Sequence, residues 1–294
     1  KLIKFNAITT GSENTNYQLH TDKGKYVLTL FEKRVKQKDL PFYINLMNFL
    51  VKNNIPSPKV ASQIQGNEIF YIKDRFGIII SYLEGSICQN ITNPKCRELG
   101  IFLAKMHSKF LKFSDKKNND YNINGCLTLF QTVANGNNIP AKDLEFLKSI
   151  FQKISNNMPA GLPKSIIHAD LFPDNLFFTG KEIAGVIDFY FACYDYQIYD
   201  LSICICAWCF DSQQNFDKLK ALEILKGYNQ IRKITNAELE ALNIFLLLAA
   251  LRFYLTRIYD NIKYAADKDR PLKNPNEFYK ILQFFANNNL SFNL

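Results

Sequence analysis

Three oxygen-bearing side chains lie in an otherwise apolar stretch of the chain, and their types and spacing suit phosphoryl transfer. Asp170 and Asn175 stand five positions apart, and Asp188 follows thirteen positions later. In such chemistry one carboxylate orients the attacking hydroxyl, while an amide and a second carboxylate hold magnesium on the phosphates of ATP. The sequence therefore predicts Asp170, Asn175 and Asp188 as catalytic residues, with Asn175 and Asp188 as the metal ligands.

The spacing around these residues is that of a known catalytic loop. His168 begins the pattern His-x-Asp-x-x-x-x-Asn that protein kinases use, and Asp188-Phe189 stands where their Asp-Phe-Gly would. Aspartate and asparagine after strands are also common turn formers, and we interpret Asp174, next to Pro173, in that way. Turn chemistry does not demand the spacing of the other residues, so we favour the catalytic interpretation for them.

Short apolar runs must position these side chains. One run leads into His168, a second follows Asn175, and a third ends at Asp188, with a turn signal between the last two. The last two runs predict a hairpin, which brings the polar side chains together although they are far apart in sequence. The runs and the turn are Ser165–Ile167, Leu176–Phe178, Ile183–Ile187 and Thr179–Lys181.

The N-terminal part alternates strand-like segments with turns and contains one amphipathic helix. A glycine and small polar side chains between the first two strands could fold over nucleotide phosphates. The predicted ATP contacts there are Ser12, Asn14, Thr15 and Asn16. The predicted strands are Ile3–Thr10, one from Tyr17, Tyr26–Phe31, Lys59–Ile64, Glu68–Lys73 and Phe76–Tyr82, with the helix over Asp39–Lys52.

The segment Ser81–Gly85 leaves the last of these strands and is the predicted junction between two lobes. The exposed backbone of such a connection can pair with the edge of an adenine, so Ser81 and Leu83 are also predicted ATP contacts. The patterns predict an α+β, bilobal fold of the protein-kinase type. A small antiparallel-sheet lobe would span residues 1–83, and a larger, mainly helical lobe would span residues 84–294.

Helical periodicity dominates the second lobe. Asn- and Lys-rich residues 115–125 indicate a surface loop. We interpret His107 as a packing or surface residue, and Asp200 as a first-turn residue that interacts with a helix dipole. The predicted helices begin at Pro94 and after Pro140, cover Tyr199–Phe210 and Phe216–Ile231, run from a capping box at Thr235–Glu238 to about Asn261, and begin again at Asn274-Pro275.

The net charge of +9 raises the question of nucleic-acid binding. The lysines and arginines are spread along the chain, with no run of four basic residues, so we expect no nucleic-acid partner. A content of 47% hydrophobic residues allows two lobes with real cores. The chain begins at Lys1 without an initiating methionine, so we expect that residues before it were removed or renumbered.

The cysteines indicate a reducing compartment. They number seven, an odd count without a paired framework. Cys204, Cys206 and Cys209 have a spacing that invites a metal interpretation, but they lie in an apolar run, so we assign them to the core. The apolar run Ile244–Leu251 is too short to span a bilayer. We therefore expect a cytoplasmic protein without a membrane partner.

With these residues in view, the chain resembles the choline-kinase and aminoglycoside-phosphotransferase group of kinase-like enzymes. More narrowly, it is similar to the homoserine kinases of that fold. The resemblance covers essentially the whole chain. The matching stretches are NYQL at 16–19, YVLTLFEKR at 26–34, LPFYINLMNFL at 40–50, IHADLFPDNLFF at 167–178, GVIDFYFACYDYQIYDLSICICAWC at 185–209 and ALRFYLTRIYD at 250–260.

The resemblance implies transfer of the γ-phosphoryl group of ATP to the side-chain hydroxyl of L-homoserine, a step of threonine synthesis. Asp170 would be the catalytic base, and His168 would brace the loop. One departure concerns Thr29, which stands where many kinases carry a phosphate-contacting lysine. Lys33 and Arg34 are the candidates for that cation.

An amino-acid substrate needs a cation for its carboxylate, and the planar fork of arginine suits one. We favour Arg252 over Arg257, with a buried structural ion pair to an aspartate as the alternative role for Arg252. Tyr190, Tyr194 and Asp195 are the other predicted substrate contacts, placed around the ammonium end.

Other functions remain open at this point. The aromatic residues of 190–208 could form a cage for a quaternary ammonium, so choline or ethanolamine is an alternative substrate, as is an aminoglycoside. A catalytically inactive nucleotide-binding scaffold is an alternative from another class, suggested by Thr29. The intact Asp170, Asn175 and Asp188 argue against it.

Overall fold

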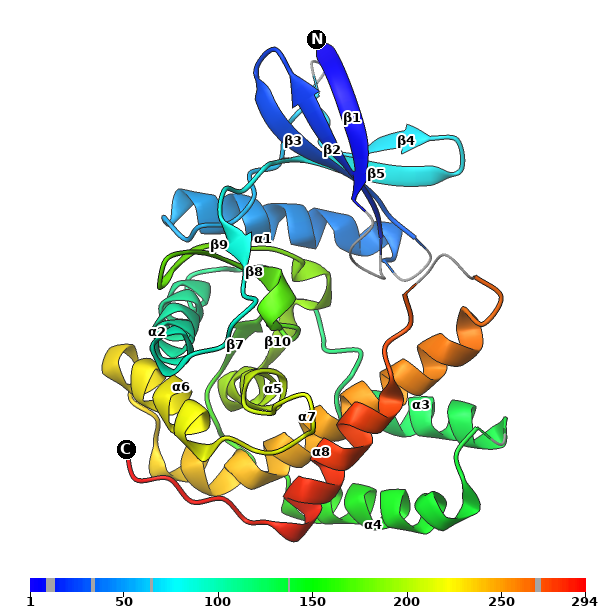
Figure 1. The fold of residues 1–294 in the computed structure, drawn as a ribbon, viewed down its shortest axis with the longest axis vertical. Helices are drawn as coiled ribbons and strands as arrows, with labels where there is room; N and C mark the ends of the chain where they lie inside the picture. Colours follow the sequence, from blue (N-terminus) through cyan, green and yellow to red (C-terminus); the bar gives the residue numbers. More distant parts are fainter. Residues whose placement is uncertain (9–13, 33–34, 64–65, 137, 268–270) are drawn as a thin grey trace.

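The computed structural model describes the chain except for residues 9–13, 33–34, 64–65, 137 and 268–270. The N-terminal part is a five-stranded antiparallel sheet in the order β1-β2-β3-β5-β4 (Figure 1). Its elements are β1 (Leu2–Ile8), β2 (Thr15–Thr21), β3 (Gly24–Leu30), α1 (Leu40–Lys52), β4 (Phe70–Ile72) and β5 (Arg75–Ser81).

Helix α1 lies between this sheet and the rest of the molecule (Figure 1). Pro41 stands in its first turn, where the missing N–H costs nothing, and the apolar positions repeat at helical spacing. Tyr43, Ile44 and Leu50 are all buried. The ring of Tyr43 packs edge-on against that of Tyr190, with centroids 5.6 Å apart, so the helix joins the sheet to the active-site region.

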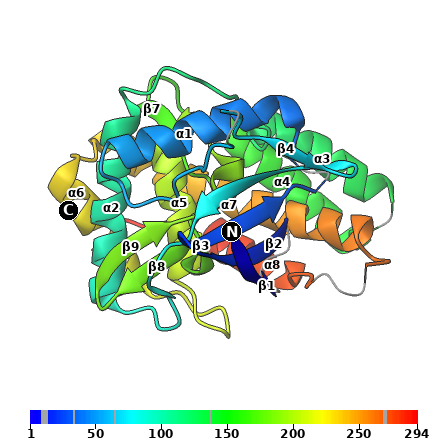
Figure 2. The same ribbon diagram turned by 90° about the horizontal axis from the view of Figure 1, so that it is seen from above.

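The remainder is mainly helical, with two small sheets that carry the predicted hairpin. Strand β7 pairs with β10, and β8 lies between β6 and β9. Figure 2 shows the sheet of the N-terminal part lying across this helical body. The elements are β6 (Ser86–Ile87), α2 (Asn93–Phe110), α3 (Ile123–Asn135), α4 (Ala141–Asn157), β7 (Lys164–Ile167), β8 (Leu176–Thr179), β9 (Glu182–Val186), β10 (Cys193–Tyr196), α5 (Gln197–Trp208), α6 (Lys218–Ile231), α7 (Asn236–Lys263) and α8 (Pro275–Asn287).

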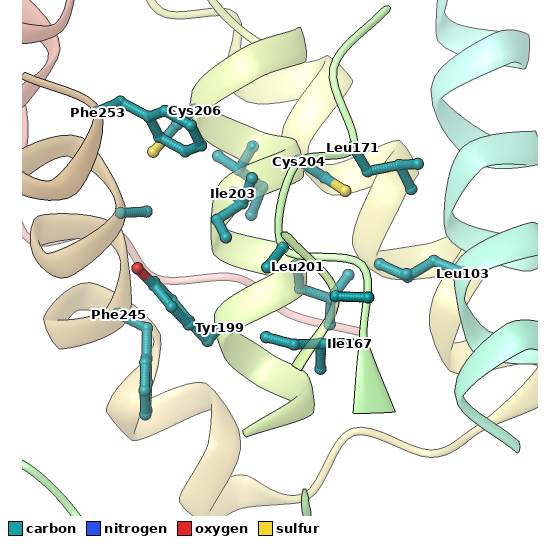
Figure 3. Packing of buried hydrophobic residues seen from close by; sticks show 14 of the residues in the cluster. Leu103, Ile167, Leu171, Tyr199, Leu201, Ile203, Cys204, Cys206, Phe245 and Phe253 are labelled. Atoms are coloured by element: carbon teal, nitrogen blue, oxygen red, sulfur yellow. The ribbon is translucent and has the colours of Figure 1, made fainter. Parts of the chain in front are cut away.

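Helices α5 and α7 form the centre of the helical body. Figure 3 shows Ile167 and Leu171, at the two ends of the catalytic loop, facing α5 near Leu201 and Cys204. All four side chains are fully buried. Burial of a large apolar side chain contributes roughly 1.5–3 kcal/mol to the free energy of folding. The packing of Ile167 and Leu171 on α5 therefore stabilises the position of the catalytic loop.

Helix α7 is long and apolar enough to cross a membrane by length and composition, because an 18-residue window has a mean hydropathy of 1.6. The short run Ile244–Leu251 had not indicated this. However, 78% of that window is buried inside the structure, so α7 packs as a core helix. The capping box predicted at its start is confirmed, since Thr235 accepts from the N–H of Glu238 and the Glu238 carboxylate accepts from the N–H of Thr235.

The predicted α+β class is confirmed, as an antiparallel sheet precedes a larger, mainly helical part. The boundary predicted between residues 83 and 84 falls in the connection from β5 to β6 and stays a prediction. Most predicted elements lie within a few residues of the observed ones. The central hairpin, for example, is formed by β8 and β9.

Two predictions about the fold were wrong. Of the segment predicted as a strand over Lys59–Ile64, the described residues 59–63 make only an isolated bridge to β5, between Val60 and Ile80. Helix α3 was not predicted, because its start lies inside the Asn-rich segment interpreted as a surface loop. In that segment the asparagine Asn122 is a helix cap, since its side chain accepts from the N–H of Gly125.

Candidate active site

His168 links the catalytic loop to Ile187, between the end of β9 and Asp188. Its Nε2 lies 2.9 Å from the carbonyl oxygen of Ile187, and the N–H of Asp170 donates to its Nδ1 at 3.2 Å. A carbonyl can only accept, so the proton must sit on Nε2 and leave Nδ1 as an acceptor. Burial lowers the pKa of His168, which keeps this neutral tautomer. These contacts support the predicted bracing role.

The backbone between His168 and Asp170 is held in an uncommon conformation by Asp200. Ala169 has a φ of +63°, in the left-handed region that residues with a Cβ rarely adopt. The carboxylate of Asp200, on α5, accepts from the N–H groups of His168 and Ala169, both at 2.8 Å. Arg252 donates to the Ala169 carbonyl at 2.5 Å from the other side.

Asp200 is in turn supported from α2. Its Oδ2 lies 3.1 Å from Nε2 of His107, whose Nδ1 lies 2.8 Å from the hydroxyl of Tyr228. Burial by itself would raise the pKa of Asp200, but its hydrogen bond with His107 and its contacts with His168 outweigh burial and lower that pKa. Asp200 is therefore a carboxylate in the folded protein.

Asn175 is bonded directly to the predicted base. Its Nδ2 donates to the Asp170 backbone carbonyl at 2.7 Å and to the carboxylate Oδ2 at 3.3 Å. The engaged amide nitrogen leaves Oδ1 as the atom that can serve as a ligand. The backbone of Asn175 also accepts from the N–H of Ile187, which ties the loop to β9.

The surroundings of the Asp170 carboxyl disfavour its ionised form. Burial, followed by the negative charge of Asp188, raises its pKa well above the ordinary value, while Arg252 and Lys273 act in the opposite direction. Asp188 itself has a φ of +64° and a ψ of +59°. The site thus contains two non-glycine residues in the left-handed region, Ala169 on the loop and Asp188 after β9, a form of strain that concentrates at functional sites.

A cavity of about 420 Å³ lies between the sheet and the hairpin, with Asn175 and Asp188 in its wall. Its volume is in the range of small-molecule sites. Val27 and Ile80 come from the sheet, while Phe177 and Ile187 come from the hairpin. The cavity therefore has apolar walls and a polar end. Of the predicted ATP contacts, the lining includes Asn14, Asn16, Ser81 and Leu83.

Thr15 and Ser12, the other predicted nucleotide contacts, are not among the described residues that line this cavity. Thr15 donates to the carboxylate of Glu32 at 2.8 Å and, among the described residues, is not part of the cavity lining. Ser12, Lys33 and Arg34 lie outside the described residues. Thr29, at the position of the usual lysine, lines the cavity and donates to the side-chain oxygen of Asn16 at 2.8 Å.

The predicted substrate contacts separate into two groups. Tyr190 lines the cavity and packs edge-on against Phe31, with ring centroids 4.9 Å apart. Tyr194 and Asp195 belong to β10 instead. Asp195 accepts from the side chain of Asn119 at 2.7 Å, so in this structure it fastens the segment before α3. In the described part of the chain, the cavity lining includes neither residue.

Arg252 lies beneath the catalytic loop and is only 1% exposed. Its guanidinium stacks over the rings of Tyr121 and Phe191, at 5.1 and 5.3 Å from their centroids. Burial disfavours its charge, but Tyr199 and Asp170 outweigh burial and raise the pKa of Arg252. These contacts favour a structural role, through the carbonyl of Ala169 rather than through an ion pair with an aspartate. Its contact with substrate stays a prediction.

Arg257 is engaged by the segment at the start of α8, where it donates to the carbonyl of Asn274 at 2.8 Å. It pairs with Glu277 of α8, at 2.6 Å. Of the two arginines, Arg252 is the one that contacts the catalytic loop directly, in agreement with the preference for it.

Three cysteines lie in α5 or directly after it, namely Cys204, Cys206 and Cys209. All three are buried in the core, and burial raises their pKa values.

The fold and these contacts define the class of the protein. The structure matches an amicoumacin kinase in complex with AMP-PNP, Ca²⁺ and Ami over 96% of this chain and 86% of that one, with a TM-score of 0.73 and 19% identity. It matches the Plasmodium vivax ethanolamine kinase over 96% of this chain and 82% of that one, with a TM-score of 0.67 and 15% identity. The fold is therefore that of the kinase-like phosphotransferases.

Sequence comparison narrows this class to a family. Residues 4–233 match the phosphotransferase enzyme family. A homoserine kinase of Parvibaculum lavamentivorans is 39% identical over 284 residues, which are 96% of this chain and 88% of that protein. One of Rhizobium meliloti is 38% identical over 260 residues, 88% of this chain and 80% of that protein. The chain belongs to the phosphotransferase enzyme family and, within it, to the homoserine kinases, which confirms the resemblance seen in its sequence.

Proposed function

We propose that this protein transfers the γ-phosphoryl group of ATP to the side-chain hydroxyl of L-homoserine, giving O-phospho-L-homoserine for threonine biosynthesis. The observation that carries the proposal is the hydrogen-bonded pair of Asp170 and Asn175, set beside a cavity that Asp188 also lines. The homoserine kinases among its relatives supply the acceptor.

Asp170 is the proposed base. A catalytic base works best when its pKa lies near the working pH, and burial together with Asp188 moves the pKa of Asp170 upward in that direction. In this role its carboxylate accepts the hydroxyl proton of the substrate and aims the oxygen at the phosphorus. His168 and Asn175 hold the carboxylate in place through their bonds to Asp170.

Asn175 and Asp188 are the proposed magnesium ligands. Their amide and carboxylate oxygens are the hard donors that this ion prefers. Within the described residues, no cluster of three or more His, Cys, Asp or Glu side chains could hold a metal by itself. This fits magnesium in kinases, which takes one or two protein oxygens and its remaining ligands from phosphates and water. The ion would offset the charge of the phosphates.

Tyr190 lines the cavity, but three other aromatic residues that suggested choline pack against the core. Trp208 and Tyr199 are fully buried, and Trp208 donates its indole N–H to the carbonyl of Leu171 at 2.8 Å. Tyr196 packs against Phe245 of α7. These rings belong to the core, which supports the homoserine proposal. We place the reaction in the cytoplasm, where cysteines remain reduced, because all seven are free.

An ADP-release assay with homoserine, choline, ethanolamine and an aminoglycoside tests the proposal. We expect homoserine to be the preferred acceptor. Asp170→Asn should lower kcat about 100- to 10,000-fold, the contribution of general-base catalysis, and leave the KM for ATP nearly unchanged. Asp74→Asn, in the exposed turn between β4 and β5, is the matched control. Preference for another acceptor would overturn the substrate, and unchanged turnover of Asp170→Asn would overturn the base.

A further inference from the structure

Lys273, far along the chain from the catalytic loop, lies against that loop. It stands just before α8, and its ammonium is 3.5 Å from the carboxylate Oδ2 of Asp174. The same ammonium lies 5.2 Å from the ring centroid of Phe172. Phe172 and Asp174 both belong to the segment between Asp170 and Asn175. A cation from a distant segment is therefore fixed over the loop that carries the proposed base.

The surroundings of Asp170 are otherwise acidic. Asp174 and Asp188, which also line the cavity, lie on or beside the same loop, and together with Asp170 they would repel an anionic substrate. Arg252 and Lys273 are among the groups that act on the charge of Asp170. Arg252 is 1% exposed and engaged by the carbonyl of Ala169. The side chain of Lys273 is 49% exposed, so its ammonium can be reached from solvent.

We propose that Lys273 binds the α-carboxylate of the amino-acid acceptor while the hydroxyl of the same molecule lies on Asp170. The inference rests on the proposed function and names a residue that determines its specificity. Choline, ethanolamine and aminoglycosides have no carboxylate, so such a contact selects an amino-acid alcohol over those acceptors.

The ion pair with Asp174 does not prevent this role. The side chains of both partners are about half exposed, and such pairs contribute only about 0–1 kcal/mol. A lysine ammonium carries three rotatable donors, so it can keep its contact with Asp174 and donate to a second carboxylate. In the free protein, the ammonium of Lys273 already lies beside Asp174 and the ring of Phe172, on the loop that carries Asp170.

The experiment compares two acceptors that differ in the carboxylate. L-Homoserine carries it, and 3-amino-1-propanol keeps the hydroxyl and the amine without it. For Lys273→Met we expect kcat/KM for homoserine to fall about 10- to 100-fold, the usual value of a hydrogen bond to a charged group. The value for 3-amino-1-propanol and the KM for ATP should change less than about twofold. Lys273→Arg should recover most of the loss.

Lys280→Met, on the exposed face of α8, is the control for removal of a nearby positive charge. An equal loss for both acceptors in Lys273→Met would place the lysine on the nucleotide or in the fold and would overturn the inference. Unchanged kinetics with homoserine would overturn it as well. These outcomes require a wild-type enzyme that phosphorylates homoserine. A wild-type enzyme that phosphorylates only another acceptor would instead overturn the proposed function.

Discussion

Asp200→Asn tests whether the catalytic loop depends on a carboxylate from α5. Asp200 is fully buried and takes three hydrogen bonds, from the N–H groups of His168 and Ala169 and from His107. Asparagine has nearly the same volume, so the substitution leaves no cavity. It replaces one acceptor oxygen with an NH₂ group, which must face at least one of these donors.

The structure sets the size of the effect. One buried donor left without a partner costs about 1–3 kcal/mol, and loss of the charge weakens the remaining bonds, so we expect the free energy of unfolding to fall by about 2–4 kcal/mol. Released from Asp200, Ala169 can leave its φ of +63°. A displacement of about 1 Å at Asp170 is enough to lower kcat about 100-fold.

Trp208 makes the assay direct. It is the single tryptophan of the chain and donates to the carbonyl of Leu171, so its fluorescence reports on the catalytic loop during urea unfolding. Ser202→Ala is the control on the same helix, because Ser202 is buried but bonds only to the carbonyl of Ile198 among the described residues. A loss below about 1 kcal/mol for Asp200→Asn, with kcat within threefold, would refute the reasoning.

The pKa of Asp200 gives the sign of the pH dependence. Its folded-state pKa is lowered, so the stabilisation it provides is complete above the unfolded-state pKa of about 4. That stabilisation is lost as the pH falls through the folded-state pKa. Asp200→Asn has no such group, so its stability should fall less steeply on acidification below pH 4 than that of the wild type.

Two further predictions concern stability and use the same urea titration. Gly100→Ala in α2 should destabilise the protein by about 2 kcal/mol or more, because its Cβ would lie 2.0 Å from the carbonyl oxygen of Ile224 in α6 and force the helices apart. Gly136→Ala, where the new Cβ meets only a flexible side-chain amide, should change little, and equal effects would contradict the packing argument. Thr235→Ala should cost about 1 kcal/mol, because it removes the capping bond to the N–H of Glu238. An unchanged urea midpoint for Thr235→Ala would show that this cap does not stabilise the folded protein.

Local patterns were enough to predict the central hairpin and several helix starts. The residues from His168 to Asp188 form their elements through neighbouring strands and a turn, so apolar runs and turn chemistry indicate them. The capping box of α7 is likewise a contact over three positions, from Thr235 to Glu238. Such features depend on residues that are close together in the sequence, and the sequence therefore predicts them well.

Contacts between distant segments were not accessible in this way. Asp200 was interpreted as a helix-dipole residue because its partners lie 31, 32 and 93 positions away, at Ala169, His168 and His107. Lys273 carries no local signal, since its neighbours on the loop lie about one hundred positions earlier in the chain. Only the tertiary fold brings the charged side chains of distant segments, such as Asp200 and Lys273, into contact with the loop.

The presence of Thr29, where many kinases carry a lysine, can be explained by the charges around that position. In protein kinases the lysine of this strand pairs with a glutamate of the following helix. Helix α1 contains no acidic residue, so a lysine at Thr29, which is 3% exposed, would be buried without a counter-charge. Such a charge costs several kcal/mol, whereas the hydroxyl of Thr29 is satisfied by Asn16. A threonine at position 29 therefore suits a helix α1 without an acidic residue, and Arg252 and Lys273, which act on the charge of Asp170, belong to the helical part.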